Sequence, residues 1–282
     1  MADIEIRPGS AADVDAAYEV LAACDHGTWF NVGPDELHEL WPFYARTWMA
    51  EKSGVVAYAA VRTNEIEVYV LPAARRRGIG SRLLDLAESA LDWPVVESSA
   101  RRDEPAAGPF FAAHGYERAY ETWLMQTELS AALVAPTWPE GITVRTFRAD
   151  DARAVKELLD AAYAADPRYS PPDFDHWRRV MTESADFDPA CWFLAEGGDG
   201  ALAGASLNWR KGFIKDLVVH PSRQRRGLGE ALVRHTLCEF RRRGVDRVTL
   251  KTDSLNPSEA RRLYERVGMH IAETYDVFEK RR

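Results

Sequence analysis

Cysteine is scarce in this chain, with three among 282 residues: Cys24, Cys191 and Cys238. Their odd number and wide spacing exclude a disulfide framework and a cysteine-based metal cluster. No grouping of His, Cys and Asp has the spacing of metal ligands either, so we expect no metal site. The low cysteine content fits a reducing compartment, and we expect a cytoplasmic protein.

Long hydrophobic runs and basic segments are also missing. The longest apolar runs, such as residues 55–61, are far shorter than the roughly 20 residues of a membrane-spanning helix. The first ten residues lack the basic and apolar regions of a signal peptide. A net charge of −8 argues against general nucleic-acid binding. We therefore expect neither membrane nor nucleic acid as a partner.

The negative charge is concentrated in the first half. Residues 1–135 contain 11 Lys and Arg against 21 Asp and Glu, whereas residues 136–282 contain 25 against 23. An acidic half is compatible with a cationic small-molecule substrate. The total length suits two domains of roughly 140 residues each.

One motif occurs twice. Residues 70–84 read VLPAARRRGIGSRLL, and residues 218–233 read VVHPSRQRRGLGEALV. Each copy has an apolar run, a proline, a basic loop, Gly-x-Gly and then a helical pattern. Free backbone N–H groups, a helix N-terminus and nearby arginines predict a site for a pyrophosphate. A dinucleotide-binding fingerprint would need a third glycine where Leu83 and Leu232 stand, and neither copy has the Gly-Lys-Ser/Thr of a P-loop.

The flanking segments repeat as well. Each half reads strand, helix, three strands, helix, strand, helix, strand, which predicts a mixed α/β fold. Residues 130–141 contain two prolines and a glycine and are interpreted as a linker. The expected domains are therefore residues 1–129 and 142–282, joined by residues 130–141.

This order of elements resembles the GNAT superfamily of N-acetyltransferases, arranged in tandem. The loops Arg75–Gly80 and Gln224–Gly229 carry the resemblance, together with Asn256 and the Leu263–Met269 run in the second half. The resemblance implies two acyl-CoA N-acyltransferase domains, each a mixed central sheet flanked by helices. It also implies acetyl-CoA as co-substrate.

In this family the pantetheine of the coenzyme pairs with the exposed backbone of a bulged central strand. The resemblance assigns that backbone to Leu217, Val218 and Val219, and in the first half to Val68, Tyr69 and Val70. Asn256 is expected to contact the coenzyme too. The remaining expected coenzyme contacts lie in the two basic loops: Gln224, Arg225, Arg226, Gly227, Leu228, Gly229 and Glu230, and Arg75, Arg76, Arg77, Gly78, Ile79, Gly80 and Ser81.

Two residues are candidates for the chemistry. Tyr264 stands where the family keeps the tyrosine that protonates the leaving thiolate. Asp216, on the predicted central strand, is a candidate base or anchor for the amine, although the neighbouring Lys215 stands where several members have Glu. In the first half Phe111 replaces the tyrosine and Asp103 replaces Asn256. We therefore expect the second half to be catalytic and the first half to be degenerate.

The expected activity is transfer of acetyl from acetyl-CoA to a primary amine of a small molecule by direct attack, in a monomer or homodimer. A non-catalytic acyl-CoA sensor remains an alternative. Within the enzyme class, mycothiol synthase and an aminoglycoside acetyltransferase remain open. The Lys211–Lys215 segment weighs against the former, because a Glu-rich lead-in is expected there. The acceptor itself is not readable from the chain.

Overall fold

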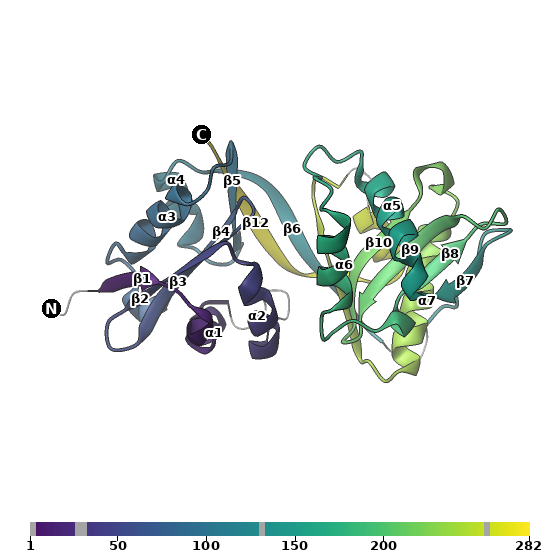
Figure 1. Cartoon of the computed structure of the whole chain (residues 1–282), viewed down its shortest axis with the longest axis horizontal. Helices are drawn as coiled ribbons and strands as arrows, with labels where there is room; N and C mark the ends of the chain where they lie inside the picture. The colour runs from purple at the N-terminus through teal and green to yellow at the C-terminus, as the bar shows by residue number, and fades with distance from the viewer. Residues whose placement is uncertain (1–3, 26–32, 130–132, 257–259) are drawn as a thin grey trace. The chain divides into compact units, whose positions relative to one another are not determined.

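The computed structural model describes residues 4–25, 33–129, 133–256 and 260–282. Contacts divide the chain into two compact units, unit 1 (Met1–Glu121 with Thr274–Arg282) and unit 2 (Thr122–Glu273). In both units the described residues form a mixed sheet with helices on its two faces (Figure 1). No described helix has the length and apolar content needed to cross a bilayer.

The sheet of unit 1 has the strand order β1-β2-β3-β4-β5-β12. Neighbouring strands are antiparallel, except that β4 and β5 are parallel. The strands are β1 (Glu5–Pro8), β2 (Arg46–Glu51), β3 (Val55–Arg62), β4 (Glu65–Val70), β5 (Val95–Arg101) and β12 (His270–Arg281). The α-helices are α1 (Val14–Asp25), α2 (Pro34–Leu40), α3 (Ile79–Ser89) and α4 (Ala107–Ala113).

Strand β3 shows how the sheet separates two cores. Successive side chains of a strand point to opposite faces. Ala57 and Ala59 accordingly pack with α3 and α4, whereas Tyr58 and Ala60 pack with α1 and α2. All four are fully buried, so β3 is covered on both faces. This explains why its sequence is almost continuously apolar.

The sheet of unit 2 has the corresponding order β7-β8-β9-β10-β11-β6. Helices α7 and α8 cover one face, and α5 and α6 cover the other. The strands are β6 (Glu117–Glu128), β7 (Thr143–Thr146), β8 (Phe193–Glu196), β9 (Leu202–Trp209), β10 (Phe213–Val219) and β11 (Arg247–Asp253). The α-helices are α5 (Ala152–Tyr163), α6 (Phe174–Thr182), α7 (Leu228–Arg242) and α8 (Ala260–Arg266).

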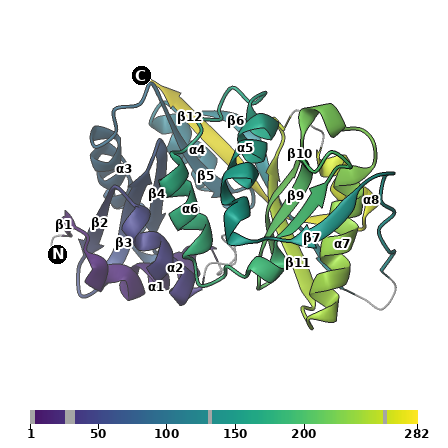
Figure 2. The same cartoon turned by 45° about the vertical axis from the view of Figure 1, so that its right-hand side comes forward.

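The last strand of each half completes the sheet of the other half. Strand β12, from the end of the chain, pairs with β5, and β6 pairs with β11. Figures 1 and 2 both show the yellow β12 beside the blue β5. The units therefore differ from the consecutive ranges 1–129 and 142–282, because each half of the chain contributes one strand to the other unit.

An ion pair at the start of each half supports the internal repeat. Arg7 lies 2.6 Å from Asp13, and Arg145 lies 2.6 Å from Asp151. Each aspartate also accepts a hydrogen bond from the backbone three residues earlier, which caps the following helix. The arginine hydrogen bonds hold the pKa of both carboxyls below the usual value. The two halves thus start their first helix with the same device.

Candidate active site

Strand β10 carries a bulge and then separates from the parallel strand β11. Ile214 pairs with Asn208 of β9 and Asp216 pairs with Leu207, so Lys215 is the extra residue. On the other side the described pairing with the parallel strand β11 ends at Ile214. The backbone of residues 217–219 is therefore unpaired by β11. This is the backbone that the family resemblance assigned to the pantetheine.

The loop after β10 has an unusual backbone. Arg225 adopts a left-handed conformation with φ of 59°, and Gly227, at the start of α7, has φ of 83°. A left-handed arginine is uncommon, and such residues concentrate at functional sites. Alternation of right- and left-handed residues turns successive N–H groups toward one point, which forms an anion-binding concavity. We call residues 225–230 the second cradle.

The second cradle has free donors. Within the described ranges, the backbone N–H groups of residues 225–230 donate to no other protein group. The first N–H groups of a helix have no partner inside the helix, and buried ones need an external acceptor. The helix dipole and the basic residues favour a negatively charged one. The residues present therefore fit the diphosphate of a nucleotide-type ligand.

The open strand edge and the second cradle line one cavity of about 920 Å³. This volume suits a cofactor-sized ligand. Arg226 is the one predicted second-half contact that does not line the cavity. The predicted residues that do line it are Asp216, Leu217, Val218, Val219, Gln224, Arg225, Gly227, Leu228, Gly229, Glu230, Asn256 and Tyr264.

Tyr264 is placed by close packing between α7 and α8. A Cβ at Gly229 would lie 3.1 Å from the Leu263 side chain, so the glycine allows the two helices to approach. Tyr264 is 7% exposed and lines the cavity. Burial, and to a lesser degree the charge of Asp216, raises the pKa of Tyr264 above its ordinary value. The phenol therefore keeps its proton at neutral pH.

Asp216 is held by a residue that sequence reasoning missed. The Tyr163 hydroxyl, at the end of α5, donates a 2.8 Å hydrogen bond to Asp216 Oδ1. Burial and the neighbouring carboxylate raise the pKa of Tyr163 well above its usual value, so this hydroxyl remains a donor. Lys215 Nζ lies 3.7 Å from the other carboxylate oxygen. No local motif signals the contact with Tyr163, since the two residues are 53 positions apart.

Three other predicted contacts have protein partners. Gln224 donates from Nε2 to the Val219 carbonyl at 3.2 Å, which fixes the start of the loop. Glu230 forms ion pairs with Arg234 and Arg266, so its carboxylate is neutralised beside the cradle. Asn256 lies 3.4 Å from the Thr252 hydroxyl oxygen.

Unit 1 contains the same loop geometry. Arg76 and Gly78 have φ of 62° and 76°, as their counterparts do. Within the described ranges the N–H groups of residues 76–81, the first cradle, also donate to no protein group. The parallel pairing of β4 with β5 is limited to Glu65↔Glu97, so the two strands separate. Strand β4, however, pairs with β3 without a register shift, so it lacks the bulge of β10.

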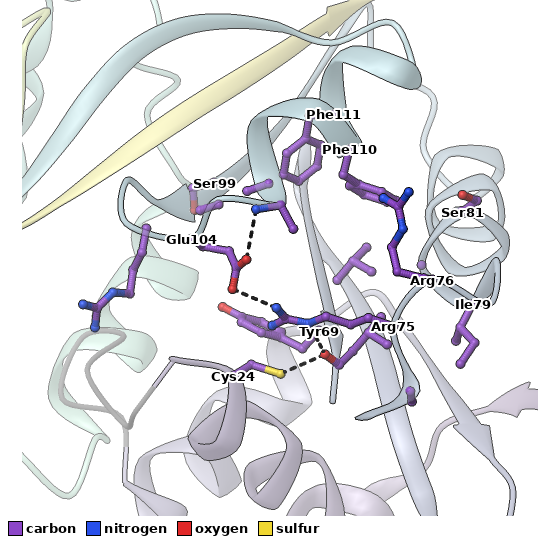
Figure 3. A pocket seen from close by; sticks show the side chains of 18 of the residues that line it. Cys24, Tyr69, Arg75, Arg76, Ile79, Ser81, Ser99, Glu104, Phe110 and Phe111 are labelled. Carbon is purple, nitrogen blue, oxygen red and sulfur yellow. Dashed lines mark hydrogen bonds and ion pairs between the residues drawn. The ribbon is translucent and has the colours of Figure 1, made fainter. Parts of the chain in front are cut away.

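The cavity of unit 1 measures about 680 Å³ (Figure 3). Arg77 does not line it. The predicted residues that do are Val68, Tyr69, Val70, Arg75, Arg76, Gly78, Ile79, Gly80 and Ser81. At the position of Tyr264 stands Phe111, which is 5% exposed and stacks on Phe278 at 4.8 Å. This cleft thus has the same frame but no phenol at that position.

The structural class of the chain is defined by two copies of one mixed α/β domain. In each copy two parallel strands separate next to a loop of free backbone N–H groups. Two family models match the chain: "Acetyltransferase (GNAT) family" over residues 152–269 and "Acetyltransferase (GNAT) domain" over residues 44–118. A mycothiol acetyltransferase of a Nocardioides species is 32% identical, with 90% of each chain covered. That of Beutenbergia cavernae is 37% identical, with 76% of each covered.

Solved structures agree with this class. A GCN5-related N-acetyltransferase from Sphaerobacter thermophilus superposes with a TM-score of 0.83 at 29% identity, covering 99% of this chain and 95% of the other. A tandem GNAT protein from the clavulanic acid biosynthesis pathway shares the fold, with a TM-score of 0.76 at 18% identity over 99% and 98%. The chain belongs to the GNAT family of acetyltransferases and has its tandem architecture.

Proposed function

We propose that this acetyltransferase moves an acetyl group from acetyl-CoA to a primary amine of a small molecule, in the cleft of unit 2. One observation carries the proposal. A carboxylate, Asp216, and a protonated phenol, Tyr264, line the same cavity as an open strand edge and an anion cradle. An amine acceptor needs a group that takes a proton, and a thiolate leaving group needs one that gives a proton.

The coenzyme would supply an acetyl thioester. The second cradle would bind its diphosphate through the N–H groups of residues 225–230, and the backbone of residues 217–219 would align its pantetheine. Asp216, oriented by Tyr163, accepts the proton of the acceptor ammonium, directly or through water. Tyr264 donates its proton to the departing thiolate. Lys215 Nζ lies 3.7 Å from the Asp216 carboxylate.

The proposal assigns turnover to unit 2 alone. Phe111, the counterpart of Tyr264, has no proton to give. The first cradle would still suit an anionic ligand, because its backbone geometry is the same. Unit 1 is therefore proposed to bind ligand or support the fold without transferring acetyl.

The relatives favour one acceptor class. Proteins named mycothiol acetyltransferase match this chain at 32% and 37% identity. We therefore place an amine precursor of mycothiol first among the acceptors, ahead of aminoglycosides. Lys215 stands in place of the glutamate expected near this position. It is therefore the residue most relevant to a preference for an acceptor other than the mycothiol precursor.

The test is thiol release from acetyl-CoA in the presence of an amine panel: the mycothiol precursor, aminoglycosides, polyamines and amino-acid amides. The proposal predicts amine-dependent release of CoA and an acetylated product by mass spectrometry. The Tyr264→Phe variant should bind CoA equally well and turn over far more slowly. Coenzyme binding without transfer to any amine in the panel would instead favour a sensor.

A further inference from the structure

Two residues that line the cleft of unit 1 form an ion pair. Arg75 Nη1 lies 3.0 Å from Glu104 Oε2, and both residues line the cavity. Figure 3 shows the two side chains pointing toward each other. Each is only about one third exposed. We call this contact the Arg75–Glu104 bridge.

Both partners are held in place by the backbone. Arg75 Nε also donates to the Val70 carbonyl at 3.1 Å, at the end of β4. Glu104 Oε1 accepts from the Ala106 amide at 3.1 Å, just before α4. The bridge therefore ties the end of β4 to the segment that follows β5. These are the two strands whose separation opens the cleft.

Among the described residues of unit 2, the loop position that corresponds to Arg75 takes part in no such ion pair. Gln224 occupies the position of Arg75 and makes the equivalent bond to the strand, from Nε2 to the Val219 carbonyl. An amide carries no charge, so it cannot form an ion pair across the cleft. The cavity of unit 2 is also larger, about 920 Å³ against about 680 Å³.

We propose that the Arg75–Glu104 bridge closes the coenzyme cleft of unit 1, so that coenzyme enters it only by displacing Glu104. This inference rests on the proposed use of coenzyme A. The Glu104 carboxylate takes up the Arg75 guanidinium, which directly precedes the first cradle in the sequence. It also places a negative charge where a phosphate-bearing ligand must pass, and like charges repel. The two clefts of one chain are thereby given different affinities for the same ligand.

The experiment is hydrogen–deuterium exchange of the full chain, titrated with CoA and read separately for peptides covering residues 76–81 and 225–230. The test variant is Glu104→Gln, which keeps the shape and removes the charge. The matched control is Glu65→Gln. Glu65 pairs with Arg62 at 2.9 Å in the same unit but does not line the cavity.

In the unaltered chain, protection of residues 225–230 should reach its midpoint at a lower CoA concentration than protection of residues 76–81. Glu104→Gln should lower the midpoint for residues 76–81 about tenfold, which corresponds to ~1.4 kcal/mol. It should leave the midpoint for residues 225–230 unchanged, and Glu65→Gln should change neither.

An unchanged midpoint for residues 76–81 in Glu104→Gln overturns the inference. So does an equal shift in the control, or a complete lack of protection of residues 76–81 in all three proteins. The proposed function fails by a different result, namely no protection of residues 225–230 in the unaltered chain.

Discussion

Replacing Gly227 by alanine isolates the contribution of the second cradle. Gly227 has φ of 83° and no atom within 4 Å of the position that a Cβ would take. The substitution therefore adds no clash, and its cost is the left-handed backbone of a residue with a side chain, about 1–2 kcal/mol. That range corresponds to a factor of about 5–30 in an equilibrium constant.

The cost can appear in one of two measurements. If the loop keeps its left-handed conformation, the free energy of unfolding falls by about 1–2 kcal/mol, and Tm falls by about 2–4 °C. If the loop relaxes to negative φ, stability is preserved and the N–H groups no longer converge. CoA affinity then falls about 5- to 30-fold instead. We predict that the two losses together amount to about 1–2 kcal/mol.

The matched control is Gly78→Ala in unit 1. Gly78 has φ of 76° and equally free space around it, so the backbone cost is the same. Calorimetry and CoA titration measure both costs, and thiol release measures turnover at limiting acetyl-CoA. Gly78→Ala should leave turnover unchanged. Unaltered stability and unaltered CoA affinity in Gly227→Ala would refute the cradle geometry, and equal losses of turnover in the two variants would refute the assignment to unit 2.

Three further predictions concern single side chains. Because the pKa of Tyr264 is raised, the phenol stays protonated as pH rises, so kcat should show no decline up to about pH 10, the ordinary pKa of tyrosine. A decline in kcat that starts near neutral pH would contradict the role of Tyr264 as proton donor. Tyr163→Phe removes the hydrogen bond to Asp216 and should lower kcat about tenfold, while the free energy of unfolding falls by only ~1 kcal/mol. An unchanged kcat would show that Tyr163 does not position Asp216 for the reaction. Asp13→Asn should lower the free energy of unfolding by ~1 kcal/mol at pH 7. Since the folded-state pKa of Asp13 is depressed, its contribution is complete above the unfolded value near 4 and is lost as pH falls below it, so urea unfolding of variant and parent should converge in acid.

The repeated motif made the main features of the fold predictable. Gly-x-Gly after an apolar run and before a helical pattern indicated a turn with a left-handed residue in each half, because glycine adopts positive φ readily, and Gly78 and Gly227 have positive φ. Mixed α/β architecture in two related units followed from the repeated order of elements and is confirmed. The left-handed conformations of Arg76 and Arg225 have no compositional signal, since arginine does not favour that region.

The exchange of β6 and β12 was not predictable. Strand pairing is non-local, and a strand's own pattern specifies which face is buried, not which partner it joins. Both last strands have similar apolar content, so either assignment satisfies the sequence. The contact of Tyr163 with Asp216 and the Arg75–Glu104 bridge are hidden for the same reason. Each joins segments that only the folded sheet brings together.

The most direct measurement of the central claim compares thiol release and CoA affinity in Tyr264→Phe and in the unaltered chain. Loss of the proton donor should reduce kcat about 10²- to 10⁴-fold, while the Kd for CoA stays the same. Adding Phe111→Tyr, the reciprocal change in unit 1, to the Tyr264→Phe variant should not restore kcat. Full turnover by Tyr264→Phe would contradict the account of how this protein transfers an acetyl group.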